Sequence, residues 1–179
     1  HYRCLSEVAK LPMREATSLP VAKCIYERLP FPARNGGLER AFIEWAQADA
    51  GVEAFCKISE TRHDFVRLRY VKEDGLPAFY SPDFLVRTVD AIFLVETKAQ
   101  EQVNNPNVQR KLKAATAWCE RINGLPDADG QIRRRWHYVL LGERIFAEWR
   151  NKGARLPELL DFARVRPLAS VISQGRLGF

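Results

Sequence analysis

The sequence predicts an α/β domain with a central mixed β-sheet of about five strands, flanked by helices. An amphipathic helical pattern comes first, at Leu38–Ala50. Short apolar segments with strand periodicity follow it, up to Lys98. A second helical pattern, Val108–Ile122, then separates these segments from a fifth strand. The order helix, strands, helix, strand is typical of a layered α/β fold.

Composition is that of a single globular domain of 179 residues with a net charge of +6. This charge suits a polyanionic partner such as nucleic acid, although a surface rich in arginine explains it equally well. No apolar run approaches the roughly 20 residues of a membrane span. Arg3, Glu7 and Lys10 interrupt any signal-peptide core. We therefore expect a cytoplasmic protein that has no membrane partner.

The sequence divides into a lead-in, a domain and a tail. Because it begins at His1 rather than Met, we interpret it as a fragment of a longer protein or a trimmed chain. We expect residues 1–35 to form an irregular lead-in or linker, with one short strand near Val21–Tyr26. That stretch contains four prolines: Pro12, Pro20, Pro30 and Pro32. Residues 36–165 form the predicted domain, and 166–179 form a C-terminal tail.

The first helix follows Asn35-Gly36-Gly37 and ends at Gly51. Its positions with helical spacing are Leu38, Ala41, Phe42, Trp45 and Asp49. The next four predicted strands are Val52–Ile58, Phe65–Val71, Phe79–Val86 and Ala91–Lys98, with a turn at Asp74-Gly75.

The second helix begins after the Asn104–Asn107 break, which also supplies its cap. Its apolar stripe consists of Val108, Leu112, Ala115, Cys119 and Ile122. Trp136–Leu141 is the predicted fifth strand, and short helices are expected at Arg144–Asn151 and Pro157–Ala163.

Cysteine and histidine spacing gives little support for zinc. No CxxC pair occurs among Cys4, Cys24, Cys56 and Cys119, and no HxH or HExxH spacing occurs among His1, His63 and His137. The cysteines are best interpreted as mostly buried thiols of a cytosolic protein.

Two acidic residues on adjacent predicted strands indicate a metal site. If the strands form a hairpin centred between Val89 and Asp90, Asp83 faces Glu96 directly. Directly paired residues project to one face with Cβ atoms roughly 5 Å apart. Two carboxylates so placed repel each other unless a cation lies between them.

Lys98 shares the strand face of Glu96, whereas Thr97 is expected to point away. Oxygen ligands suit Mg²⁺ better than Zn²⁺. A metal held by Asp83 and Glu96 could activate a bound water, and Lys98 could neutralise charge on a phosphate. Pro-Asp can also be a simple turn and Glu-x-Lys an ordinary ion pair. The joint pattern on two central strands favours the catalytic interpretation.

At these residues the sequence resembles the PD-(D/E)XK nuclease superfamily, which has a restriction-endonuclease-like core. Pro82-Asp83 and Glu96-Thr97-Lys98 match its two half-motifs in order and spacing. A longer series resembles the C-terminal endonuclease domain of the type III restriction enzyme Res subunit, over about residues 30–165. The series comprises Glu39 with Phe42, Val52 with Phe55 and Lys57, Tyr80 to Phe84, Glu96 to Ala99, and Lys111 through Trp118.

The resemblance implies Mg²⁺-dependent cleavage of double-stranded DNA, with Mn²⁺ as a substitute. Asp83, Glu96 and Lys98 would be catalytic. The metal would be held by Asp83, Glu96 and the backbone carbonyl of Thr97. Glu39 could join them, or it could simply be an anion placed favourably near a helix N-terminus.

The implied partners are a helicase-like ATPase domain upstream on the same chain and a methyltransferase or specificity subunit. The sequence has no Gly-rich P-loop, so no ATPase activity is expected of this chain. Little sequence preference is expected either, because the resemblance implies that another subunit recognises the DNA site.

Several polar residues are candidates for DNA contact: Gln109, Lys111 and Lys113 on the second helix, and the basic run Arg133, Arg134 and Arg135. Each could equally be solvated. Gln100 either continues the face of Lys98 or lies in a loop. The four tryptophans favour core packing over base stacking.

Two other functions remain open at this stage. One is a non-catalytic DNA-binding or docking module on a nuclease-like fold. The other is a DNA-repair or mobile-element nuclease with the same active site.

Overall fold

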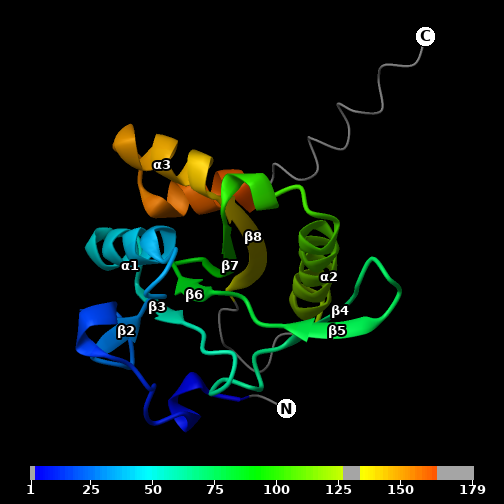
Figure 1. Cartoon of the computed structure of the whole chain (residues 1–179), viewed down its shortest axis with the longest axis horizontal. Coiled ribbons are helices and arrows are strands. Elements are labelled where there is room, and N and C mark those ends of the chain that lie inside the picture. Colours follow the sequence, from blue (N-terminus) through cyan, green and yellow to red (C-terminus); the bar gives the residue numbers. More distant parts are fainter. Residues whose placement is uncertain (1–2, 127–133, 165–179) are drawn as a thin grey trace.

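The computed structural model describes residues 3–126 and 134–164. Its centre is a four-stranded mixed sheet in the order β3-β6-β7-β8 (Figure 1). Its strands are β3 (Ala54–Lys57), β6 (Phe84–Arg87), β7 (Ala91–Lys98) and β8 (Arg135–Gly142). β3, β6 and β7 are antiparallel neighbours, and β8 runs parallel to β7. The predicted mixed α/β architecture is confirmed, with four strands in the central sheet instead of about five.

A separate two-stranded sheet accounts for the difference. β4 (Leu68–Val71) and β5 (Pro77–Tyr80) pair only with each other among the described residues. The prediction of one strand over Phe79–Val86 was therefore wrong, because the chain leaves β5 after Tyr80 and enters the central sheet at β6. Pro82 lies in the break, and its missing N–H favours an interruption at this point.

The N-terminal segment contains two 3₁₀ turns, η1 (Leu5–Glu7) and η2 (Glu15–Thr17), and a small hairpin. In the hairpin, β1 (Ser18–Pro20) pairs with β2 (Arg28–Pro30). The predicted strand at Val21–Tyr26 was wrong, since these residues form the connecting loop.

The predicted helices are present, with shifted ends. α1 is Gly37–Ala48, α2 is Pro106–Asn123 and α3 is Glu143–Asn151; residues 156–164 are also helical. α2 begins as expected from its sequence, because the Asn105 side chain accepts a hydrogen bond from Asn107 N at 2.9 Å and Pro106 occupies the first turn.

Two apolar clusters form the layers on either side of the sheet. One joins α1, α3 and residues 156–163 to the sheet face that carries Phe84 and Val95, and it includes Leu29 of β2. The other joins α2 and the β4–β5 hairpin to the face that carries Leu94. Figure 1 shows α1 and α3 on one side of the sheet and α2 on the other.

All four cysteines are free thiols. Within the described ranges, no helix combines the length and the apolar character needed to cross a bilayer.

Candidate active site

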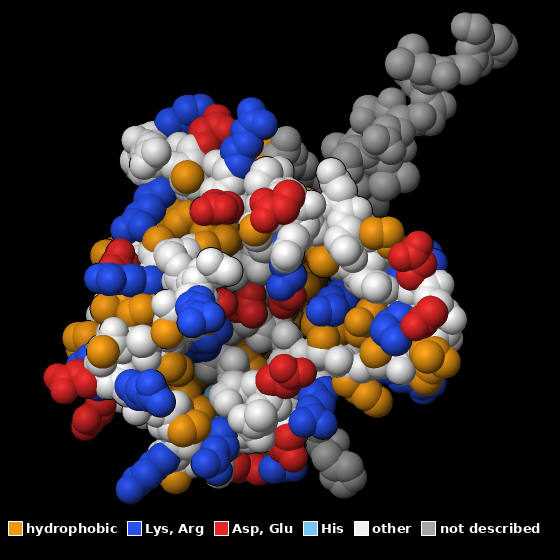
Figure 2. Space-filling model, in the orientation of Figure 1, with side chains coloured by type: hydrophobic (Ala, Val, Ile, Leu, Met, Phe, Trp, Pro, Cys, Tyr) orange, Lys and Arg blue, Asp and Glu red, His pale blue; other side chains and the backbone are white. Residues whose placement is uncertain are grey.

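The ends of the central strands form a notch. β3 ends at Lys57 and β6 begins at Phe84, whereas β7 continues to Lys98. Phe84 pairs with Val95, which is the register predicted from the sequence. Asp83, one residue before β6, therefore lies beside Glu96. In Figure 2, acidic side chains are recessed near the middle of the molecular face, with Lys and Arg side chains on both sides of them.

Asp83 forms hydrogen bonds with residues of both neighbouring segments, at the end of β7 and just past β3. Its Oδ2 accepts hydrogen bonds from Thr97 N at 2.7 Å and Thr97 Oγ1 at 2.8 Å. Its backbone oxygen accepts a bond from Ile58 N at 2.8 Å, just past β3. The expectation that Thr97 points away was wrong, because Asp83 lies beyond the paired part of β6 and its carboxylate reaches the Thr97 hydroxyl. Both of these side-chain bonds use Oδ2, so within residues 3–126 and 134–164 the Asp83 Oδ1 atom forms no hydrogen bond to the neighbouring strands.

Glu96 and Lys98 form an ion pair, with Oε1 and Nζ 2.7 Å apart. The Glu96 side chain is only 4% exposed and that of Lys98 is 22% exposed. Burial first, and then the charge of Asp83, raise the pKa of Glu96 to about 7, against the opposing effect of Lys98. Burial disfavours the charged form of Lys98. Nearby carboxylates, Glu96 first and then Asp83 and Glu39, outweigh that effect and raise the pKa of Lys98.

A second ion pair lies at the same notch. The ammonium of Lys57 on β3 contacts Glu39 Oε2 on α1, and both side chains are less than one-fifth exposed. The effect of Glu39 on the pKa of Lys98 places Glu39 within electrostatic reach of the Asp83–Glu96–Lys98 group. Of the two readings of Glu39, the structure therefore supports proximity to the candidate site.

The carboxylates fit a divalent cation. Glu96 Oε2 is buried and lacks a hydrogen-bond partner in the described part of the chain, whereas the buried Glu39 Oε2 has the Lys57 ammonium as its ionic partner. Buried anionic oxygens are costly unless they are paired or bound to a metal. Over residues 3–126 and 134–164, no cluster of three His, Cys, Asp or Glu side chains could hold a metal. A bound ion would therefore complete its coordination with backbone carbonyl, water or phosphate oxygens, as Mg²⁺ commonly does.

Two tyrosines and a lysine form one wall of the site, and sequence reasoning missed the tyrosines. Tyr80 of β5 donates a hydrogen bond to Lys111 O at 2.8 Å. Burial raises the pKa values of Tyr80 and Tyr138, and the charge of Glu96 adds to both effects. The Lys111 ammonium lies 5.0 Å from the Tyr80 ring centroid and lowers the pKa of Glu96. Only their approach in the fold identifies these residues, since they come from three separate elements.

The other predicted site residues on and near α2 are exposed. Gln100 is exposed and begins the 3₁₀ turn η3 (Gln100–Gln102), so β7 has already ended and the loop interpretation is correct. Gln109 is exposed, and its side-chain amide donates to Val103 O at 2.7 Å, which serves the start of the helix. Lys113 is exposed on α2. Lys111 alone among the three candidates on α2 faces the carboxylates.

Arg134 and Arg135 of the predicted basic run do not lie at this site. Arg135 pairs in register with Ala91, at the opposite end of β7 from Lys98. Seven strand residues correspond to roughly 23 Å. The Arg134 guanidinium donates to Thr88 O at 2.9 Å and to Glu53 Oε2 at 3.0 Å. Arg133 lies outside the described residues. The sequence placed this run before a strand but gave no information about which end of the sheet it would occupy.

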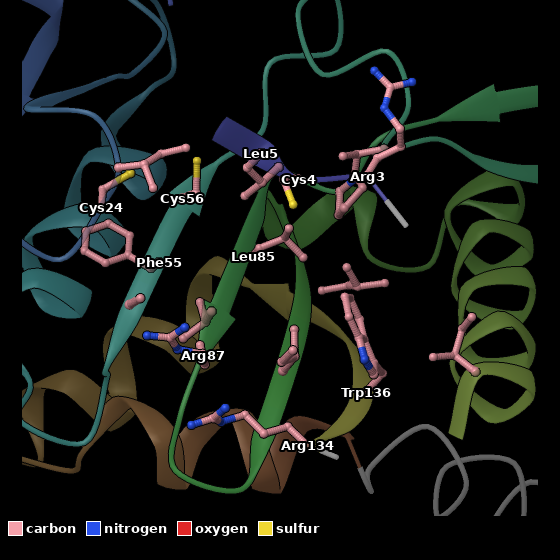
Figure 3. A pocket seen from close by; sticks show the side chains of 18 of the residues that line it. Arg3, Cys4, Leu5, Cys24, Phe55, Cys56, Leu85, Arg87, Arg134 and Trp136 are labelled. Atoms are coloured by element: carbon pink, nitrogen blue, oxygen red, sulfur yellow. The ribbon is translucent and has the colours of Figure 1, made fainter. Parts of the chain in front are cut away.

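A larger hollow lies away from the carboxylates. This groove, of about 1520 Å³, opens over β3, β6 and part of α2 (Figure 3). Its lining includes Cys24, Cys56, Leu85, Arg87, Arg134 and Trp136. None of Asp83, Glu96 and Lys98 lines it. The groove is largely apolar, so the buried and unpaired Glu96 Oε2 identifies the chemical site better than the volume of the groove does.

Comparison with known families agrees with this geometry. Residues 56–124 match the family model of the TnsA-like endonuclease N terminal. That family belongs to the PD-(D/E)XK, or restriction-endonuclease-like, superfamily. The matched stretch runs from β3 to the end of α2 and contains Asp83, Glu96 and Lys98, but not Glu39. Searches of curated proteins and of solved structures give no match. The match supports an endonuclease-like domain, whereas the similarity to the type III restriction domain is not shown by it.

Proposed function

We propose that this chain is a metal-dependent endonuclease domain that hydrolyses phosphodiester bonds of double-stranded DNA. The observation that supports the proposal most is the meeting of Asp83, Glu96 and Lys98 at one notch, with Glu96 Oε2 buried and unpaired. The TnsA-like endonuclease match over the same residues supports it independently.

Each residue has a distinct proposed role. Asp83, Glu96 and the Thr97 backbone carbonyl would hold Mg²⁺, with Mn²⁺ as a substitute. Glu39 would join them only after it turns away from Lys57. When bound, the metal supplies Lewis-acid polarisation of the phosphate and a more acidic water. Lys98 would orient the attacking water or donate a hydrogen bond to the phosphate oxygen that gains charge. Glu96 keeps Lys98 in place through their ion pair.

The biological setting remains a separate proposal. The type III restriction assignment, the upstream helicase-like ATPase and the methyltransferase subunit rest on sequence resemblance alone. The cytoplasmic location is an expectation from the composition of the sequence. The TnsA-like match makes an endonuclease outside type III restriction the better supported setting.

Cleavage of supercoiled plasmid in Mg²⁺ tests the proposal. Asp83→Ala and Lys98→Ala should each reduce the rate at least about a hundredfold, while the circular dichroism spectrum stays unchanged. The control is Lys152→Met, which removes an exposed ammonium that pairs with Glu148 on α3.

Metal binding distinguishes the endonuclease from a non-catalytic DNA-binding or docking module. Titration of Mg²⁺ or Mn²⁺ into the protein with a duplex present should give a saturable heat signal beyond that of the duplex alone, and Asp83→Ala should abolish this difference. Cleavage retained in either alanine variant would refute the assignment. Normal DNA binding without any metal uptake would favour a DNA-binding or docking module.

A further inference from the structure

A second lysine lies on the far side of Asp83 from Lys98. β6 has β3 on one side and β7 on the other. Lys57, the last residue of β3, pairs with Phe84, which directly follows Asp83. Lys98 is the last residue of β7. The strand order therefore places one lysine at the end of each of the two strands that flank β6, which Asp83 directly precedes.

Lys57 is unusually enclosed for a lysine. Its side chain is 15% exposed, less than the 22% of Lys98. Its ammonium lies 5.0 Å from the centroid of the Phe84 ring and contacts Glu39 Oε2. Glu39 Oε2 has no hydrogen bond of good geometry within the described residues. The Lys57 ammonium is therefore the partner that neutralises Glu39 Oε2, and any exchange of partners has to replace this ion pair.

We propose that Lys57 is a second phosphate-binding residue of the nuclease centre, held by Glu39 until a DNA phosphate replaces this carboxylate. The inference rests on the proposed function. Lys98 keeps its bond to Glu96, whereas Lys57 exchanges Glu39 for a non-bridging phosphate oxygen. Glu39 is then free to turn toward Asp83 and Glu96.

Charge balance supports this exchange. Asp83, Glu96 and Glu39 carry three negative charges, and Lys57 and Lys98 carry two positive ones. The notch thus has one net negative charge when all five are ionised. A divalent cation and one phosphodiester anion together cancel it. Without Lys57 the loaded site would carry a net negative charge, which opposes the entry of a polyanion.

A purely structural role for the Lys57–Glu39 pair is less well supported. Such a role would be to tie α1 to the sheet. Phe42 of α1 already stacks on Phe84 of β6, with ring centroids 4.5 Å apart, and both side chains are fully buried. Ion pairs in enclosed positions add little stability once desolvation is subtracted. The aromatic contact therefore makes the ionic tie unnecessary for the packing of α1.

DNA binding without metal tests the proposal on the full chain. Affinity for a short fluorescent duplex is measured by anisotropy in EDTA at several salt concentrations. Lys57→Met should weaken binding about tenfold, the effect expected for one charge-assisted hydrogen bond. It should also reduce the slope of log affinity against log salt by about one. Lys57→Arg should retain affinity within about threefold, and the Lys152→Met control should stay within about twofold of wild type.

Substitution of Glu39 should change DNA affinity in the direction opposite to substitution of Lys57. Glu39→Gln frees Lys57 and should tighten binding several-fold in EDTA. In the double variant Lys57→Met/Glu39→Gln that gain should disappear, because the freed ammonium is no longer there. A structural tie predicts equal losses of stability in both single variants and no change in affinity. Unfolding curves of all variants provide this comparison.

The proposal is overturned if Lys57→Met matches Lys152→Met in both affinity and salt slope. It is equally overturned if the gain from Glu39→Gln persists undiminished in the double variant. Should Lys57→Met fail to fold, Lys57→Gln carries the same expectations. Because these measurements need neither metal nor cleavage, a wild-type chain that binds DNA but never cuts removes the nuclease proposal alone. If the chain does not bind the duplex, both the nuclease proposal and the proposed role of Lys57 are refuted.

Discussion

Burial sets the chemistry of Glu96. Its side chain is 4% exposed and one of its oxygens is unpaired, so its ionised form is poorly solvated. An ammonium and a bound cation each favour the ionised form, and the Lys98 ammonium is already present. Ionised Glu96 is therefore destabilised by burial, and a bound divalent ion would offset this cost. As a result, metal affinity and the stability of the fold should both depend on pH through this side chain.

Stability without metal should fall as pH rises through the Glu96 titration. The folded pKa is about 7, above its ordinary value of 4.5. The protonated form is thus favoured by folding, and its contribution is complete below about pH 4.5 and lost as pH rises through about 7. The difference corresponds to on the order of 3 kcal/mol. Urea unfolding in EDTA should show Glu96→Gln more stable than wild type at pH 8, with the two converging below pH 5.

Magnesium should reverse this trend. Because the ion needs the ionised carboxylate, added Mg²⁺ should stabilise wild type more at pH 8 than at pH 6, and Glu96→Gln much less at either pH. A wild-type chain whose stability in EDTA is flat between pH 5 and 8 would contradict the assignment of this raised pKa.

Thr97 is the residue whose hydroxyl positions Asp83. Thr97→Val keeps the shape and the backbone bond from Thr97 N but removes the 2.8 Å hydroxyl bond. Loss of such a supporting bond typically costs about tenfold or more in metal affinity. Titration calorimetry with Mn²⁺ should show this loss, whereas Thr88→Val, at the other end of β7, should bind as wild type does. Equal affinity in both variants would show that the backbone bond alone positions Asp83.

At the scale of elements, the unequal lengths of neighbouring strands create the site. β3 ends at Lys57 and β6 begins at Phe84, so the last residues of β7 have no antiparallel neighbour. Side chains from α1, β3, β5 and α2 can therefore approach Glu96 from different directions. The break at Pro82 serves this arrangement, because a continuous strand from β5 into β6 would fill the notch.

The packing of α1 on β6 should control both stability and the site. Phe42→Ala removes a fully buried ring that stacks on Phe84, and it should cost about 3–5 kcal/mol in the free energy of unfolding. The control is Phe79→Ala on β5, where the ring is 63% exposed and the cost should be under about 0.5 kcal/mol. Chemical denaturation of the two variants measures the difference. Similar midpoints would mean that α1 contributes little to the core.

At the scale of the whole molecule, the N-terminal segment contributes to the main core. Leu29 is fully buried, and Tyr26 and Leu11 are each 8% exposed in the cluster that contains α1 and the sheet. The Tyr26 hydroxyl also bonds Val8 O at 2.8 Å and the His63 ring at 2.9 Å. The segment before the predicted domain start is thus packed against the apolar layer that contains α1.

Removal of residues 1–35 should therefore destabilise the remaining chain strongly. The truncated protein should lose a sharp thermal transition, because the apolar surface under Leu29 becomes exposed. Leu29→Ala in the full chain should cost about 2–5 kcal/mol, and Ile25→Ala, at a side chain 57% exposed, should cost little. A truncated chain that unfolds as cooperatively as the full one would show that 36–165 is a sufficient folding unit.

By itself, the sequence determined the local order of elements and the hairpin register that brings Asp83 beside Glu96. Both depend on short-range signals: hydrophobic periodicity, turn residues and a short hairpin whose register follows from its centre. Only the tertiary structure decided that Phe79–Val86 splits between two sheets, that Lys57 with Glu39 and Lys111 with Tyr80 surround the carboxylates, and that Arg134 lies at the opposite end. These outcomes depend on which distant segments pack together, and that choice is made by burial of the whole apolar surface, which no local pattern records.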